Sequence, residues 1–235
     1  LVIGGGCGGL QSAITAADRG HQVILCEKTD VLGGLINFTD HTDHKIDIRN
    51  YKNLLVHDVK QRPVDIRLNC EVTPEMIKEI APDAVILAVG SDDLILPING
   101  IENAVTAMDV YYNDFKVLGH STIVLGGGLV GCEAAADYID HGVETTIVEM
   151  KDALMPETTG LYRTAVHDFI DKNGGKYEVN AKVIKVGKDF VVAEQDGKEI
   201  TLKADSVVNA MGRRAHNADT LETAIKESNI PVWKI

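Results

Sequence analysis

Two stretches of this chain carry the same pattern of glycines followed by an acidic residue. The first reads LVIGGGCGGLQSAITAADRGHQVILCEKTD at residues 1–30, and the second reads IVLGGGLVGCEAAADYIDHGVETTIVEMKD at residues 123–152. Each contains G-x-G-x-x-G, and a glutamate follows 23 positions after the first glycine. The residues concerned are Gly4, Gly6, Gly9 and Glu27 in the first copy, and Gly126, Gly128, Gly131 and Glu149 in the second.

These residue types at this spacing suit the binding of a dinucleotide. The first glycine permits a tight turn, the second lets the backbone approach a pyrophosphate, and the third lets a helix sit close to the sheet. Amide groups at the helix start hold the phosphates, and the carboxylate accepts hydrogen bonds from ribose hydroxyls. Because a carboxylate repels a ribose 2′-phosphate, Glu149 favours NADH over NADPH. Lys151 either softens that preference or is a solvated surface lysine.

Both motifs need strands and helices to present them, and the chain alternates short apolar runs with helical patterns. This alternation predicts an α/β fold with two Rossmann-like dinucleotide-binding domains. The expected strands are 1–3, 22–27, 65–69, 83–90, 121–125, 144–149 and 205–212, and the expected helices are 9–19, 45–61, a helix capped by Thr73, 131–141 and 158–172. A meander of antiparallel strands is expected between the last helix and the last strand. Loop residues place domain boundaries near 98–104 and near 212.

Composition limits the classes of partner. The 235 residues are 45% hydrophobic and carry a formal net charge of −12, so no basic field exists to attract nucleic acid or anionic lipid. No apolar run approaches the length of a membrane span. The four cysteines form no C-x-x-C pair, which argues against a zinc site and favours the cytoplasm. No metal site is expected, and His41, Asp43 and His44 are interpreted as solvated loop residues.

Several further motifs point to a known family. They are GGGLVGCEAA followed by VETTIVEM, LGG at 32–34, VILAVGS at 85–91 and VVNAMGRR at 207–214. Together they resemble the C-terminal module of old-yellow-enzyme-type NADH:flavin oxidoreductases, a group that includes 2,4-dienoyl-CoA reductase and trimethylamine dehydrogenase. This group belongs to the two-dinucleotide-binding flavoprotein superfamily, and the resemblance spans essentially the whole chain.

The resemblance implies a role for each domain. Residues 1–100 would form the first segment of a domain that binds FAD (or ADP), residues 101–211 would bind NAD(P)H, and residues 212–235 would return to the first domain. In the first domain the implied cofactor contacts are Gly4, Gly6, Gly9, Glu27, Lys28, Gly33, Gly34 and the backbone of Val72. In the second they are Gly126, Gly128, Gly131, Glu133 and Glu149.

Two of the implied contacts, Glu133 and Arg213, keep alternatives open. Glu133 corresponds to a glutamate near the nicotinamide amide in related reductases, and it also suits the first turn of any helix because of the helix dipole. Gly90 and Gly212 end the strands where the chain crosses between domains. Arg213 either reaches a cofactor phosphate or is a surface residue.

The implied activity is hydride transfer from NADH to FAD, in which the cofactors carry the chemistry and no catalytic acid or base is named. Electrons would pass to a catalytic domain of the same polypeptide that holds FMN and a 4Fe–4S centre and reduces an enoyl-type substrate. Because the chain starts within a strand and without Met, it is expected to be part of a longer protein. The redox cysteine pair of the disulfide reductases is absent, so disulfide reduction is not expected. The alternatives are an electron-input subunit like the small subunit of glutamate synthase, and a non-redox module that holds ADP.

Overall fold

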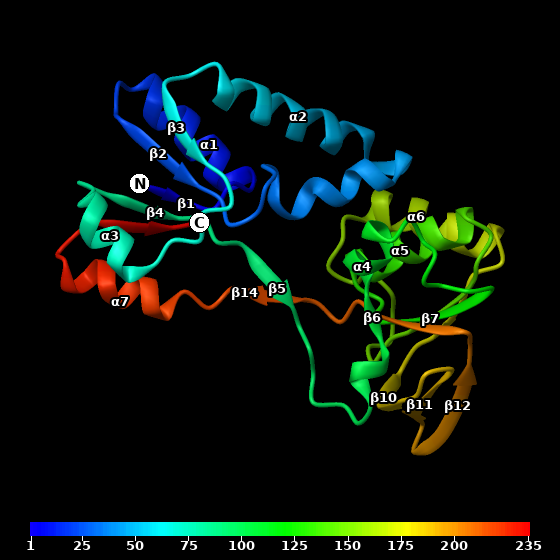
Figure 1. Ribbon diagram of the computed structural model, residues 1–235. Helices are drawn as coiled ribbons and strands as arrows, with labels where there is room; N and C mark the ends of the chain where they lie inside the picture. Colours follow the sequence, from blue (N-terminus) through cyan, green and yellow to red (C-terminus); the bar gives the residue numbers. More distant parts are fainter. The chain divides into compact units, whose positions relative to one another are not determined.

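The computed structural model describes all residues from 1 to 235 and divides into two compact units. Unit 1 contains residues 1–92 and 215–235, and unit 2 contains residues 93–214 (Figure 1). The second unit is therefore inserted into the first, as the sequence predicts. The boundaries lie at residues 92 and 214, not at 100 and 211. The first differs because Leu94 N donates to Gly212 O and Val186 N donates to Asn99 O, which ties the segment after residue 92 to unit 2.

Unit 1 is built on a parallel five-stranded sheet with the order β15-β4-β1-β2-β3. Its strands are β1 (Val2–Ile3), β2 (Val23–Cys26), β3 (Val64–Arg67), β4 (Val85–Leu87) and β15 (Val232–Lys234). Its helices are α1 (Cys7–Asp18), α2 (Ile46–Lys60), α3 (Pro74–Ile80) and α7 (Asp219–Glu227), with 3-10 segments η1 (Gly34–His41) and η2 (Asp43–Lys45). Thr73 caps α3, because its hydroxyl accepts from Met76 N, as the sequence predicts.

Unit 2 repeats this plan with the sheet order β6-β13-β7-β8-β9. Its parallel strands are β6 (Val105–Thr106), β7 (Ser121–Leu125), β8 (Glu144–Val148), β9 (Lys176–Glu178) and β13 (Ser206–Asn209). Its helices are α4 (Ala107–Tyr112), α5 (Leu129–Asp140) and α6 (Gly160–Lys172), and η3 (Ile101–Asn103) is a 3-10 turn. The predicted meander is present as β10 (Ala181–Val186), β11 (Phe190–Gln195) and β12 (Lys198–Lys203).

Alternation of side chains along the strands gives each sheet two buried faces. In β7, Val124 packs with residues of α5 and α6, whereas Ile123 and Leu125 pack with Val191 and Ala193 of the meander. In unit 1, Val2 packs with residues of α1 and α2, whereas Ile3 packs with residues of α3 and α7. Each glycine loop therefore follows the carboxyl end of the central strand of its sheet, and both faces of that sheet are covered.

Strands β5 (Ser91–Asp93) and β14 (Arg213–Ala215) pair with one another and carry the chain between the units. Arg213 forms an ion pair with Asp93 on this ribbon. His216 Nδ1 lies 2.9 Å from a carboxylate oxygen of Asp92.

No helix of the structure combines the length and apolar character that crossing a bilayer demands.

The glycine-motif helices begin two residues earlier than the sequence predicts. Gly6 and Gly128 are their N-caps, so each helix starts directly after the second glycine of its motif. They end as predicted, with Gly20 (φ +84°) and Gly142 (φ +79°) in the left-handed conformation just after the last turn.

Candidate functional site

The first and third glycines of both motifs are required by backbone packing. Gly4 has φ +105°, and a β-carbon built on it would lie 2.3 Å from the carbonyl oxygen of Ala88. A β-carbon at Gly9 would lie 1.8 Å from Gly4 O, far inside van der Waals contact. Helix α1 can therefore approach the sheet only because these positions lack a side chain.

Unit 2 has the same constraints at equivalent positions. Gly126 has φ +103°, and a β-carbon there would lie 2.7 Å from Ala210 O. A β-carbon at Gly131 would lie 1.9 Å from Gly126 O. The repeat in the sequence is thus a repeat of backbone geometry.

The second glycines differ, because nothing in the protein requires them. Gly6 and Gly128 have φ of −75° and −73°, values that any residue adopts. A β-carbon at Gly6 would come no closer than 3.9 Å to Gly34 Cα, and one at Gly128 would meet nothing within 4 Å. Each leaves free the space in front of a helix N-terminus, where the dipole and unpaired amides favour an anion. This cradle fits the diphosphate of a dinucleotide.

Both predicted carboxylates are held against their own glycine loop. Glu27 is 7% exposed and Glu149 is 8% exposed. The Oε2 atom of Glu27 accepts from Gly5 N at 2.7 Å, and that of Glu149 accepts from Gly127 N at 2.6 Å. The carboxylates lie at the carboxyl ends of β2 and β8, where a dinucleotide places its adenosine ribose.

The second oxygen of each carboxylate is bound differently in the two units. Glu27 Oε1 accepts from both the amide and the hydroxyl of Thr29, at 2.9 and 2.8 Å. Glu149 Oε1 accepts from Lys151 N at 2.8 Å. Since an ionised carboxylate has about four acceptor sites, Glu149 with its two backbone donors keeps capacity for a ribose diol.

Gly5 and Gly127, which lie between the first and second glycines of the motifs, are constrained positions that the sequence prediction does not include among the site residues. A β-carbon at Gly5 would lie 2.7 Å from Leu32, and one at Gly127 would lie 2.3 Å from Leu154 and 2.9 Å from Glu149 Cβ. Any side chain there would collide with its surroundings beside the glutamate that accepts from this glycine's own amide. The signal was available, because both copies have glycine at this position.

The structure brings Gly33 and Gly34 to the first glycine loop. Gly33 N donates to Gly5 O at 2.8 Å, and a β-carbon at Gly34 would lie 2.8 Å from Gly6 Cα. Both have positive φ, +117° and +59°. These two residues therefore border the same cradle as the motif glycines.

Other predicted contacts are placed less closely. Val72 is buried beside Cys70, whose amide donates to Glu27 O at 2.8 Å, whereas Lys28 is exposed. Gly90 and Gly212 have positive φ and accept hydrogen bonds from the ribbon segments between the units. The predicted phosphate contact Arg213 is engaged with Asp93 on that ribbon.

Glu133 lies in the first half of α5 and is paired with a tyrosine. The hydroxyl of Tyr162, in the first turn of α6, donates to Glu133 Oε1. Partial burial, followed by this carboxylate, raises the pKa of Tyr162 to about 12. The tyrosine therefore remains a neutral donor at physiological pH.

The cysteines are all free thiols. Burial, followed by the neighbouring Cys70 thiol, raises the pKa of Cys26 to about 12.

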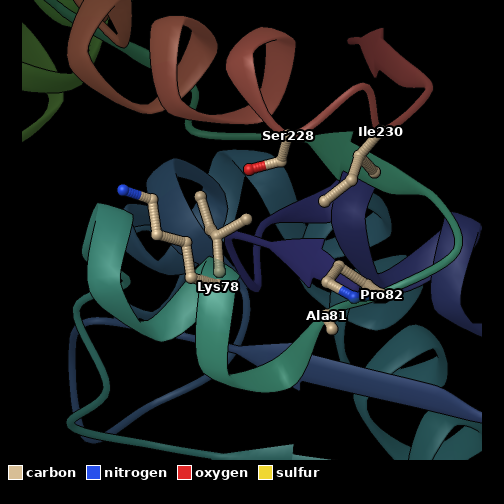
Figure 2. Close-up of a pocket in the computed structure, with 6 residues that line it drawn as sticks. Lys78, Ala81, Pro82, Ser228 and Ile230 are labelled. Carbon is tan, nitrogen blue, oxygen red and sulfur yellow. The ribbon is translucent and has the colours of Figure 1, made fainter.

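A pocket in unit 1 lies away from the motifs, between the C-terminal ends of α3 and α7 (Figure 2). It is lined by Ile77, Lys78, Ala81, Pro82, Ser228 and Ile230. Helix α3 leads into β4, so its C-terminal end faces the sheet edge opposite the glycine loops.

Comparison with known proteins agrees with this geometry. The family model described as pyridine nucleotide-disulphide oxidoreductase matches residues 1–232. The chain belongs to the pyridine nucleotide-disulphide oxidoreductase family. Its assignment to the two-dinucleotide-binding flavoproteins and its predicted fold class are thereby confirmed, and it carries the FAD- and NAD(P)H-binding fold of that family.

Similar members are much longer than this chain. It is 37% identical to cinnamate reductase of Clostridium sporogenes over 90% of the chain and 32% of the relative. It is 31% identical to bilirubin reductase of Mediterraneibacter gnavus over 99% of the chain and 36% of the relative. A solved 2-naphthoyl-CoA reductase superposes over 100% of the chain and 36% of its own, with a TM-score of 0.89 and 26% identity. The chain thus spans about a third of the length of these relatives.

Proposed function

We propose that this chain is an electron-input module in which unit 2 binds NADH and unit 1 binds FAD. The observation that carries the proposal is the pair of glycine loops, each with an unobstructed second glycine and a carboxylate fixed on its middle amide. When bound, nicotinamide supplies a hydride and the flavin accepts it. The chain's own residues bind and orient the two cofactors.

In unit 1, the amides at the start of α1 would hold the diphosphate and Glu27 the adenosine ribose. Gly33 and Gly34, which border Gly6, would flank the diphosphate. Lys28 and the backbone of Val72 would lie on the adenosine side, because both are close to Glu27 in the chain or in space.

In unit 2, the amides at the start of α5 would hold the NADH diphosphate and Glu149 the adenosine ribose. Glu133, oriented by Tyr162, would contact the nicotinamide half of the cofactor. Arg213 would approach a phosphate only after leaving Asp93. The preference for NADH follows from Glu149, since a 2′-phosphate at about 4 Å from its carboxylate is repelled by about 1–4 kcal/mol.

The onward acceptor is proposed from the relatives. Their length leaves room for a fused catalytic domain, and the names of two of them, cinnamate reductase and 2-naphthoyl-CoA reductase, refer to conjugated acids or thioesters. We infer that electrons pass from FAD to a domain with FMN and a 4Fe–4S centre that reduces an enoyl-type substrate.

The second glycines allow a sharp test. Gly6→Ala and Gly128→Ala place a methyl group in the proposed diphosphate cradles without contacting protein closely, so stability should fall by no more than about 1 kcal/mol, the cost of alanine at a helix N-cap. Calorimetric titration should show binding of FAD, or of ADP, weakened at least about tenfold by Gly6→Ala only. Binding of NADH should be weakened similarly by Gly128→Ala only.

Each variant is the control for the other. Unchanged binding in both would refute the placement of the cofactors. A first site that binds ADP and rejects FAD would instead support the non-redox alternative. Electron transfer from NADH to a dye by the wild-type protein would contradict that alternative.

A further inference from the structure

The ribose side of the second site contains a lysine held by two carboxylates. Lys151 N donates to Glu149 Oε1 at 2.8 Å, and Lys151 Nζ donates to Glu157 Oε1 at 2.9 Å. Glu149 is the residue proposed to read the ribose, and Glu157 lies in the loop between β8 and α6. The lysine side chain is thus directed to a carboxylate that is not part of the glycine motif.

The first copy has a lysine directly after its carboxylate, Lys28, and no cation at the position of Lys151. Thr29 occupies the position equivalent to Lys151, and both its amide and its hydroxyl bind Glu27 Oε1. Only the second site therefore has an ammonium two residues beyond its ribose-reading carboxylate. In isolation such an ammonium would attract a ribose 2′-phosphate and oppose the discrimination by Glu149.

Glu157 removes that opposing effect. Its carboxylate bonds the ammonium directly and raises the pKa of Lys151, while Lys151 lowers the pKa of Glu157. Both groups are therefore ionised at neutral pH, and the three residues together carry a charge of about −1. An approaching 2′-phosphate would therefore meet the Glu157 carboxylate beside the ammonium and would have to compete with it for the lysine.

We infer that Glu157 is a specificity-determining residue that withholds Lys151 from a ribose 2′-phosphate and so maintains the preference for NADH. This inference rests on the proposed function of unit 2, which it deepens. Glu157 acts through Lys151 and is a positioning residue that touches no reacting atom.

The test compares ADP-ribose with its 2′-phosphorylated form, titrated calorimetrically into the 235-residue chain. The variants are Glu157→Gln, Lys151→Gln and the double variant, with Glu199→Gln on β12 as a control that makes the same charge change on another sheet. Glu157→Gln should tighten binding of the 2′-phosphorylated ligand about two- to fivefold, the range expected for an exposed ion pair. It should leave ADP-ribose affinity within about twofold.

The double variant identifies the mechanism. In the Lys151→Gln background, Glu157→Gln should no longer change the ratio of the two affinities. A change that persists there would show direct repulsion by Glu157 and would overturn the inference, as would an unchanged ratio in Glu157→Gln alone. Wild-type protein that binds neither ligand would refute the proposed function itself, and the inference with it.

Discussion

At the scale of single residues, the glycines of the two loops are glycine for different reasons. Gly9 and Gly131 are small because a carbonyl oxygen lies within 2 Å of the place of a β-carbon, and Gly127 because a methyl group of Leu154 and the Cβ of Glu149 lie within 3 Å of it. Gly128 has no such neighbour, which is why its absence of a side chain points to a ligand. The spacing of glycines alone does not separate these causes.

Cys132 shows how burial near the motif suppresses chemistry. It is fully buried in α5, and burial, followed by the Glu149 carboxylate, raises the pKa of its thiol to about 12. Because the thiolate is the reactive form, we expect iodoacetamide at pH 8 to leave Cys132 unmodified in the native protein and to label it in urea. Peptide mass spectrometry measures this, and labelling of native Cys132 at the rate of an exposed cysteine would contradict it.

At the scale of elements, α5 and the sheet approach one another over Gly131. Alanine there would improve helix propensity by up to about 1 kcal/mol, but its β-carbon would lie 1.9 Å from Gly126 O. We expect the clash to prevail and Gly131→Ala to lower the free energy of unfolding by about 1–3 kcal/mol. Urea denaturation measures the difference, with Gly128→Ala in the same motif as the matched control. Equal stabilities of the two variants would contradict this account of the glycines.

At the scale of the whole molecule, each unit has its own sheet and its own buried clusters. Unit 2 is also continuous in sequence. We therefore expect a fragment of residues 93–214 to fold cooperatively and to bind NADH with an affinity within about threefold of that of the full chain. Circular dichroism during thermal unfolding and calorimetric titration check this, and a fragment without a cooperative transition would show that unit 2 depends on unit 1.

Much of this molecule is readable from the sequence because its signals are local. Buried parallel strands are continuous apolar runs, helices follow the glycine motifs, and Gly20 and Gly142 mark helix ends. The motif repeat and the acidic residue 23 positions later predict the sheet edge, the helix start and the carboxylate together. The sequence pattern places both helix starts two residues late, because it does not show that the second glycine itself is the cap.

Only the tertiary structure decided which hydrogen bonds and ion pairs form between residues that folding brings together. The domain boundary depends on hydrogen bonds between segments more than 80 residues apart, such as Val186 N to Asn99 O. The engagement of Lys151 by Glu157 and of Arg213 by Asp93 depends on side-chain directions that no pattern encodes. The sequence by itself thus determined the class of fold and the class of ligand, because backbone geometry and apolar periodicity are short-range properties. Only the folded structure decided which charges remain available to that ligand, because ion pairs form between residues that packing brings within a few ångströms.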